Sequence, residues 1–122
     1  MSSTTIHMIV GSVTLLLFLV NVIMYALEMF KGTPVAYHRL VSIGAATGLL
    51  LQYALGFMLL GAGNDSRWTH WVLALVAILP VGMEHGMTAN QTNFRTKSML
   101  GLIASTLTFI IVLAVYAIGE MN

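Results

Sequence analysis

Four long apolar stretches make up most of this sequence. Each runs for about 20 residues, the length of helix that crosses the ~30 Å hydrocarbon core of a bilayer. Only the third stretch contains a charged residue, Glu84. The stretches are Met8 to Leu27, Leu40 to Gly63, Trp68 to Ala89 and Met99 to Ile118. We therefore predict four transmembrane helices.

The composition does not suit a water-soluble domain of this length. Of the 122 residues, 58% are hydrophobic and 7% are charged, and the mean hydropathy is +0.91. A chain of this size cannot bury so much apolar surface in a core of its own, so lipid must solvate it. Transmembrane strands would alternate polar and apolar residues, whereas these stretches are apolar throughout. We expect an all-α integral membrane protein.

Short connections between the stretches predict one compact domain over residues 1–122. Connections of about 8 to 10 residues make consecutive helices antiparallel neighbours, as in an up-down four-helix bundle. Pro80 interrupts the third stretch, and membrane helices tolerate proline where neighbours satisfy the freed carbonyl. We expect helices over approximately residues 6–30, 36–62, 68–89 and 97–119.

Lysine and arginine are unevenly divided among the three connections. Lys31 and Arg39 flank the first, Arg95 and Lys97 lie in the third, and the second has only Arg67. Basic residues concentrate in cytoplasmic loops, so we expect the first and third connections to be cytoplasmic. We expect a protein of a prokaryotic inner membrane with both termini on the non-cytoplasmic side. No basic stripe indicates a nucleic-acid partner.

Absent residue types exclude several kinds of chemistry. The chain has no cysteine, which excludes disulfides, iron–sulfur ligation and thiol catalysis. No lysine lies within a predicted span, which excludes a retinal Schiff base. Small residues, among them Gly44 and Gly48, mark the second helix as one that packs closely against something. That partner is either another helix or a flat ligand.

The four histidines are the main candidates for chemistry, and their predicted depths sort them into two layers. His7 and His70 open helices on the non-cytoplasmic side. His38 opens a helix on the cytoplasmic side, and His85 lies near the cytoplasmic end of the third helix. His70 and His85 are separated by about 22 Å along a helix. Ionisable residues within membranes face the bundle interior and are functional candidates.

Paired imidazoles in an apolar bundle are typical of haem sites. Axial imidazoles hold the iron, the macrocycle fills the interior, and the propionates meet cations at the interface. Arg67 on one side and Arg39 on the other are the candidate cations. His7 and His70 would ligate one haem b.

A second haem b is left open, with His38 and His85 as its candidate ligands. The same residues have simpler explanations, because histidine is comfortable at a membrane interface and His85 can pair with its neighbour Glu84. Another alternative is a copper-like site, since thioether and imidazole suit soft metals. Its ligands would be Met83, Glu84, His85 and Met87.

The order of residues after Tyr37 resembles a known family. Tyr37-His38-Arg39 is followed by Gly44 and then by Leu51-Gln52-Tyr53-Ala54-Leu55-Gly56-Phe57. This is similar to the cytochrome b-five-sixty-one family, in which a helix opens with a haem-ligating histidine and runs through a glycine to a glutamine and a Gly-Phe pair. The family's next helix begins with arginine and a ligating histidine and ends in a glycine and a glutamate. Arg67, His70, Gly82 and Glu84 match this pattern.

The neighbouring helices add to the resemblance. The preceding helix of the family also opens with a ligand histidine, as in Thr5-Ile6-His7, and the following helix carries Leu-Gly-Leu, as in Leu100-Gly101-Leu102. The resemblance implies that His7 and His70 share one haem and that His38 matches a ligand of a second. In the family the partner of that ligand comes from a helix before His7, for which this sequence has no room. His85, a partner subunit or no ligand at all are the alternatives.

These observations predict a membrane b-type cytochrome subunit that carries electrons through one or two bis-histidine haems. We expect an electron-transfer subunit rather than a stand-alone enzyme. The short connections offer little docking surface, so we expect other membrane subunits or redox partners beside the lipid bilayer. The alternative is a haem-free accessory or structural subunit of a larger respiratory or photosynthetic membrane complex.

Overall fold

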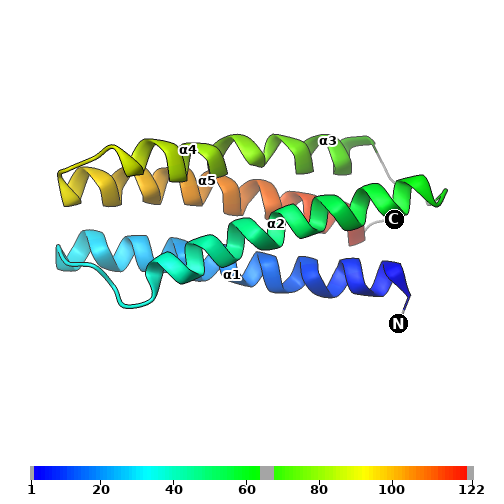
Figure 1. The fold of residues 1–122 in the computed structure, drawn as a ribbon, viewed down its shortest axis with the longest axis horizontal. Coiled ribbons are helices and arrows are strands. Elements are labelled where there is room, and N and C mark those ends of the chain that lie inside the picture. The colour runs from blue at the N-terminus through cyan, green and yellow to red at the C-terminus, as the bar shows by residue number, and fades with distance from the viewer. Residues whose placement is uncertain (1, 64–67, 121–122) are drawn as a thin grey trace.

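A computed structural model of the chain describes residues 2–63 and 68–120, and within these ranges it contains helices and connections but no strand. The helices form an elongated up-down bundle (Figure 1). They are α1 (Ser3–Lys31), α2 (His38–Gly61), α3 (Trp68–Val76), α4 (Ile78–Ala89) and α5 (Phe94–Glu120). The predicted all-α fold is confirmed.

Four helical segments are long and apolar enough to cross a membrane, and α3 and α4 together form one of them. The segments are Thr4–Lys31, His38–Gly61, Trp68–Ala89 and Phe94–Gly119. The first and last helices begin about three residues earlier than the sequence predicts. At the first, the Ser2 hydroxyl accepts the Thr5 amide N–H at 3.1 Å and caps the helix. His7 therefore lies one turn inside α1.

Pro80 accounts for the break between α3 and α4. Proline has no amide N–H, so the carbonyl of Val76, four residues earlier, loses its usual helical partner. α3 ends at Val76, and α4 begins at Ile78 after a single turn residue, Ala77. Tyr53 on α2 donates its hydroxyl proton to the carbonyl of Ala74 and so ties α2 to the last turn of α3.

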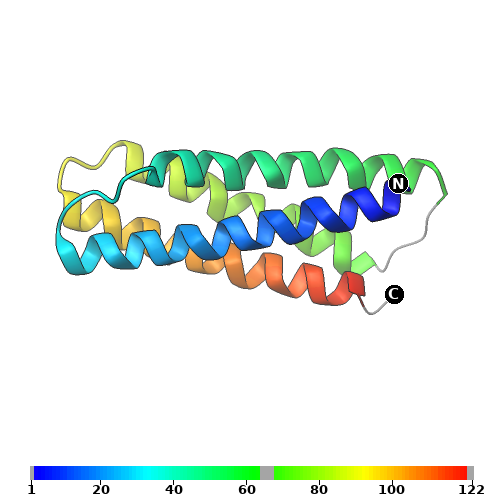
Figure 2. The ribbon, with the colours of Figure 1, turned by 90° about the horizontal axis from the view of Figure 1, so that it is seen from below.

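The helices do not all pack equally tightly. α1 packs against α2 and α5, and α5 packs against α3 and α4, whereas α2 and α3 approach each other at few points. Figures 1 and 2 show α3 and α4 following one another along the long axis of the bundle. A buried cluster fills the middle of the bundle: Phe18, Ala45, Leu49, Ala77, Val81 and Val112.

Small residues bring α1 and α2 together, as one reading of the sequence predicted. A Cβ atom at Gly48 would collide with the side chain of Thr14 on α1, and one at Gly44 would lie 3.8 Å from Leu17. These two glycines thus serve helix–helix packing. Substitution of Gly48 would have to separate the two helices.

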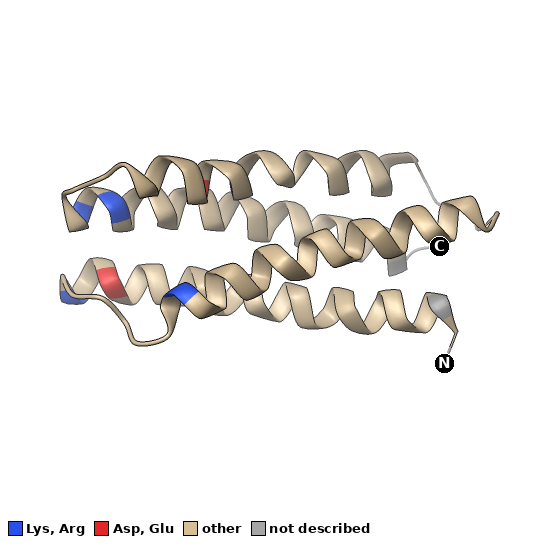
Figure 3. Ribbon diagram, viewed as in Figure 1, with Lys and Arg blue, Asp and Glu red and all other residues tan. Residues whose placement is uncertain are grey.

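The two ends of the bundle differ in charge. All the lysine and arginine residues that the structure describes lie toward the end that carries the α1–α2 and α4–α5 connections (Figure 3). We call this the basic end; it holds Lys31, Arg39, Arg95 and Lys97. The opposite end, with both ends of the described chain, is the His7 end (Figure 1).

Candidate functional site

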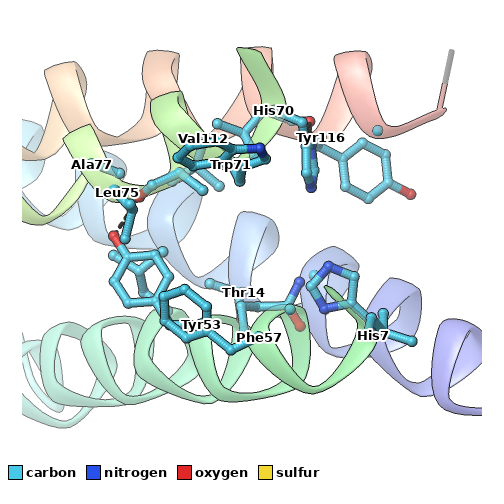
Figure 4. A pocket seen from close by; sticks show the side chains of 18 of the residues that line it. His7, Thr14, Tyr53, Phe57, His70, Trp71, Leu75, Ala77, Val112 and Tyr116 are labelled. Carbon is cyan, nitrogen blue, oxygen red and sulfur yellow. Dashed lines mark hydrogen bonds between the residues drawn. The ribbon is translucent and has the colours of Figure 1, made fainter. Parts of the chain in front are cut away.

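His7 on α1 and His70 on α3 line one cavity at the His7 end. Their ring centroids are 6.4 Å apart, and the ring planes meet at 76°. The cavity measures about 370 Å³, within the range of about 300–1,000 Å³ that is usual for ligand pockets. Figure 4 shows the two imidazoles across it from one another. Apolar and aromatic side chains supply most of the wall: Met8, Leu49, Tyr53, Phe57, Leu60 and Trp71.

The tautomer of His70 follows from its hydrogen bond to α5. Its Nδ1 lies 2.9 Å from the carbonyl oxygen of Val115 on α5. A carbonyl only accepts, so Nδ1 carries the proton and, in the neutral ring, Nε2 keeps a free lone pair. An imidazole that donates one N–H to a backbone carbonyl is the usual arrangement of a metal-ligating histidine. Glycine makes room for this ring, because a Cβ atom at Gly119 would lie only 2.9 Å from His70 Cε1.

His7 has a buried nitrogen that no described residue hydrogen-bonds. Among the described residues, its Nδ1 has no hydrogen-bond partner, and neither does the buried Oε1 atom of Gln52, another residue of the cavity wall. Buried polar atoms left alone cost about 1–3 kcal/mol, so such atoms call for an explanation such as a ligand. Gly56 borders His7: a Cβ atom there would lie 3.6 Å from His7 Cε1.

The distance between the two rings suits a shared metal ion. Metal–imidazole bonds are about 2.0–2.1 Å long, so two rings on opposite sides of one ion have centroids about 6.5 Å apart. Among the described residues, no three His, Asp or Glu side chains come together as a site for a bare metal ion. Haem iron needs only axial ligands from the protein, since the porphyrin supplies the other four. The two histidines and the apolar wall therefore fit haem.

Of the two predicted arginines, the structure describes only Arg39, and Arg39 does not line this cavity. Arg39 lies beside His38 at the basic end, with an exposed side chain, on the opposite side of the bundle core. Arg67 lies outside the described residues.

A buried polar cluster surrounds Glu84 near the basic end. This carboxylate is 1% exposed. Its Oε2 atom accepts hydrogen bonds from Asn21 Nδ2 at 3.1 Å, from the Tyr25 hydroxyl at 2.9 Å and from the Ser42 hydroxyl at 2.5 Å. Asn21 thus forms a hydrogen bond between α1 and α4. Three donors from α1 and α2 thus converge on one oxygen of Glu84.

His38 belongs to the same cluster, and both of its ring nitrogens have partners. Nδ1 lies 2.8 Å from Glu28 Oε1, and Nε2 lies 2.9 Å from Asn21 Oδ1. Glu28 also accepts the Val35 amide N–H at 2.9 Å, which fixes the α1–α2 connection. Tyr25 packs edge-on against the imidazole, with ring centroids 4.2 Å apart. His38 is thus held as a hydrogen-bonding residue.

His85 lies at the edge of this cluster, with about 40% of its side chain exposed. Its Nε2 is 3.4 Å from the Ser42 hydroxyl and 4.0 Å from Glu84 Oε1, the outer limit of an ion pair. The contacts run from His85 through Ser42, Glu84 and Asn21 to His38. The structure thus brings His7 and His70 together directly and connects His38 with His85 only through other side chains.

Sequence reasoning missed Glu28, Tyr25 and Ser42. Glu28 did offer a signal, because a carboxylate in the last turn of a helix faces the negative end of the helix dipole and needs a partner. Tyr25 and Ser42 offered none, because hydroxyl groups are common in membrane helices.

Comparison of the chain with protein-family models, curated proteins and solved structures found no match.

Proposed function

We propose that this chain is a b-type cytochrome subunit in which His7 and His70 hold the iron of one haem. The observation that carries the proposal is the pair of imidazoles 6.4 Å apart in an apolar cavity, one of them oriented by a backbone carbonyl. The resemblance to the cytochrome b-five-sixty-one helices supports the same pair. Haem would supply reversible one-electron chemistry, so the chain would carry electrons rather than transform a substrate.

The chain's own residues would position the ligands and exclude water. The carbonyl oxygen of Val115 fixes the orientation and tautomer of the His70 ring. Gly56 and Gly119 leave space beside the two rings. The aromatic side chains of Tyr53 and Phe57 keep the cavity apolar, which is one of the means by which a protein sets a haem potential.

We assign iron ligation to His7 and His70 alone. Both nitrogens of His38 are engaged with Glu28 and Asn21, and His85 lies beside Ser42 and Glu84 rather than in the cavity wall. Neither belongs to the proposed haem site. We propose Arg67, three positions before His70 in the sequence, as a cation for a haem propionate.

We propose that the basic end faces the cytoplasm of a prokaryotic cell and the His7 end faces the opposite side of the inner membrane. The gathering of lysine and arginine at one end supports this orientation. The chain lacks cysteine, so single cysteines at Thr33 and Ser2 would report sidedness. A membrane-impermeant maleimide added to intact cells should label Ser2→Cys and leave Thr33→Cys unlabelled; the reverse pattern would refute the orientation.

The haem assignment is tested by spectra of purified variants. The dithionite-reduced minus oxidised spectrum should show a b-type α-band in the wild-type protein and in the matched control His85→Ala. The band should be lost or strongly reduced in His7→Ala and in His70→Ala. A colourless wild-type protein, purified gently with its partner subunits attached, would favour a haem-free accessory subunit instead.

A further inference from the structure

A second site lies at the other end of the bundle, around Glu84. A charged group inside the bilayer is costly, and chains of Glu and His side chains in membranes are typical of proton relays. Glu84 lies within the third membrane-spanning segment and is 1% exposed. We propose that Glu84 is a proton-accepting site that exchanges protons with the basic end of the bundle through His85 and Ser42.

The entry group of this path is His85. About 40% of its side chain is exposed, and it lies four residues before Ala89, the last residue of α4. That places it about 6 Å along the axis from the end of the helix. Histidine gains and loses a proton near neutral pH, which suits a group that exchanges protons with its surroundings.

The hydroxyl of Ser42 is the link between His85 and Glu84. The direct distance of 4.0 Å between His85 Nε2 and Glu84 Oε1 is too long for a hydrogen bond. The Ser42 Oγ atom lies 3.4 Å from His85 Nε2 and 2.5 Å from Glu84 Oε2, so it contacts both. A hydroxyl donates and accepts at the same atom, which allows it to pass a proton on.

Two coupled proton movements carry a proton from His85 to Glu84. The proton on His85 Nε2 moves to Ser42 Oγ while the hydroxyl proton of Ser42 moves to Glu84 Oε2. An imidazolium and a carboxylate become a neutral imidazole and a carboxylic acid, and the serine hydroxyl is formed again. The step removes two opposite charges, and Asn21 and Tyr25 hold the accepting Glu84 oxygen in place through hydrogen bonds.

The neighbouring pair of Glu28 and His38 does not provide a competing path. Asn21 donates its Nδ2 to Glu84, so its Oδ1 accepts, and His38 Nε2 must carry a proton. His38 Nδ1 faces the Glu28 carboxyl group, and one further proton lies between them. The pair is therefore neutral overall, and the Asn21 amide separates it from Glu84.

The other groups around Glu84 carry no additional charge. From α1 it meets Asn21 and Tyr25, and from α2 it meets Ser42. α5 packs against both α1 and α4. Among the described residues of α5, the buried polar side chains bear only hydroxyl groups: Ser98, Ser105 and Thr108. His85 is thus the titratable group on the exposed side of Glu84.

Infrared spectroscopy of the purified full-length chain tests this site without reference to haem. On acidification the wild-type protein should gain a carboxylic-acid carbonyl band that Glu84→Gln lacks. After a rapid pH drop, this band should rise about a hundredfold more slowly in Ser42→Ala and in His85→Gln. Ser42→Thr keeps the hydroxyl, and Thr47→Ala alters an exposed position of the same helix. In both of these variants Glu84 should be protonated at the wild-type rate.

Two results would overturn the proposal. One is an acid-dependent carbonyl band that persists unchanged in Glu84→Gln, because Glu84 would then not be the acceptor. The other is a wild-type rate in His85→Gln. His85 is exposed enough for its replacement to leave the fold intact, so a wild-type rate there would mean that protons reach Glu84 by another route.

Discussion

The contact between Gly101 and Tyr25 offers a sharp test of how the Glu84 cluster is built. Gly101 on α5 is buried, and a Cβ atom at this position would collide with the Tyr25 ring. That ring carries the hydroxyl that donates to Glu84 at 2.9 Å. Gly101→Ala should therefore push Tyr25 away from Glu84.

The expected loss of stability can be assembled from three effects. Overpacking of a close contact costs about 1–3 kcal/mol. An interhelical hydrogen bond in a membrane protein contributes about 0.6–1.7 kcal/mol. Replacing a glycine within a helix by alanine stabilises the helix by about 0.5–1 kcal/mol, which offsets part of this loss. Gly101→Ala should lower the free energy of unfolding by about 1–4 kcal/mol.

Unfolding in mixed micelles titrated with a denaturing detergent measures this free energy. Gly82→Ala is the matched control: a Cβ atom there meets nothing within 4 Å. It should leave stability unchanged or raise it. In a Tyr25→Ala background the ring is absent, so the cost of Gly101→Ala should disappear. An equal cost in both backgrounds would refute the packing argument.

Two further perturbations test other parts of the structure. Gly119→Ala would place a Cβ atom 2.9 Å from His70 Cε1, so this variant should bind severalfold less haem per chain. Gly61→Ala is the control, because a Cβ atom there meets nothing within 4 Å and should leave the haem content unchanged. Equal haem contents in the two variants would contradict the assigned position of the His70 ring. Glu28→Ala removes the acceptor of the Val35 amide N–H. Hydrogen exchange at that amide should therefore accelerate by about ten- to a hundredfold. An unchanged exchange rate would show that this hydrogen bond does not fix the α1–α2 connection.

The helices and their order were predictable because lipid imposes a simple rule on sequence. A span needs about 20 apolar residues, and the short connections leave one topology. The proximity of His7 to His70 followed from the same rule, since the first and third helices of an up-down bundle run in the same direction and both histidines lie near their starts. The structure agrees on each of these points, with helix ends that differ by a few residues.

The contacts of the Glu84 cluster could not be predicted in the same way. The helices are apolar on every side, so the sequence does not tell which face of a helix turns inward. The positions of Asn21, Tyr25 and Ser42 around one carboxylate depend on the rotation of three helices. The close approach of α5 at Gly101 sets part of that rotation, and a single glycine does not reveal its neighbour.

The most direct test of the central claim is electron paramagnetic resonance of the oxidised protein. Two axial imidazoles produce a low-spin ferric haem, and the account predicts that signal in the wild-type chain, with its loss in His7→Ala and in His70→Ala. The signal should persist in His38→Ala, since His38 is engaged with Glu28 and Asn21. A low-spin signal that survives in either His7→Ala or His70→Ala would contradict the proposed pair of ligands.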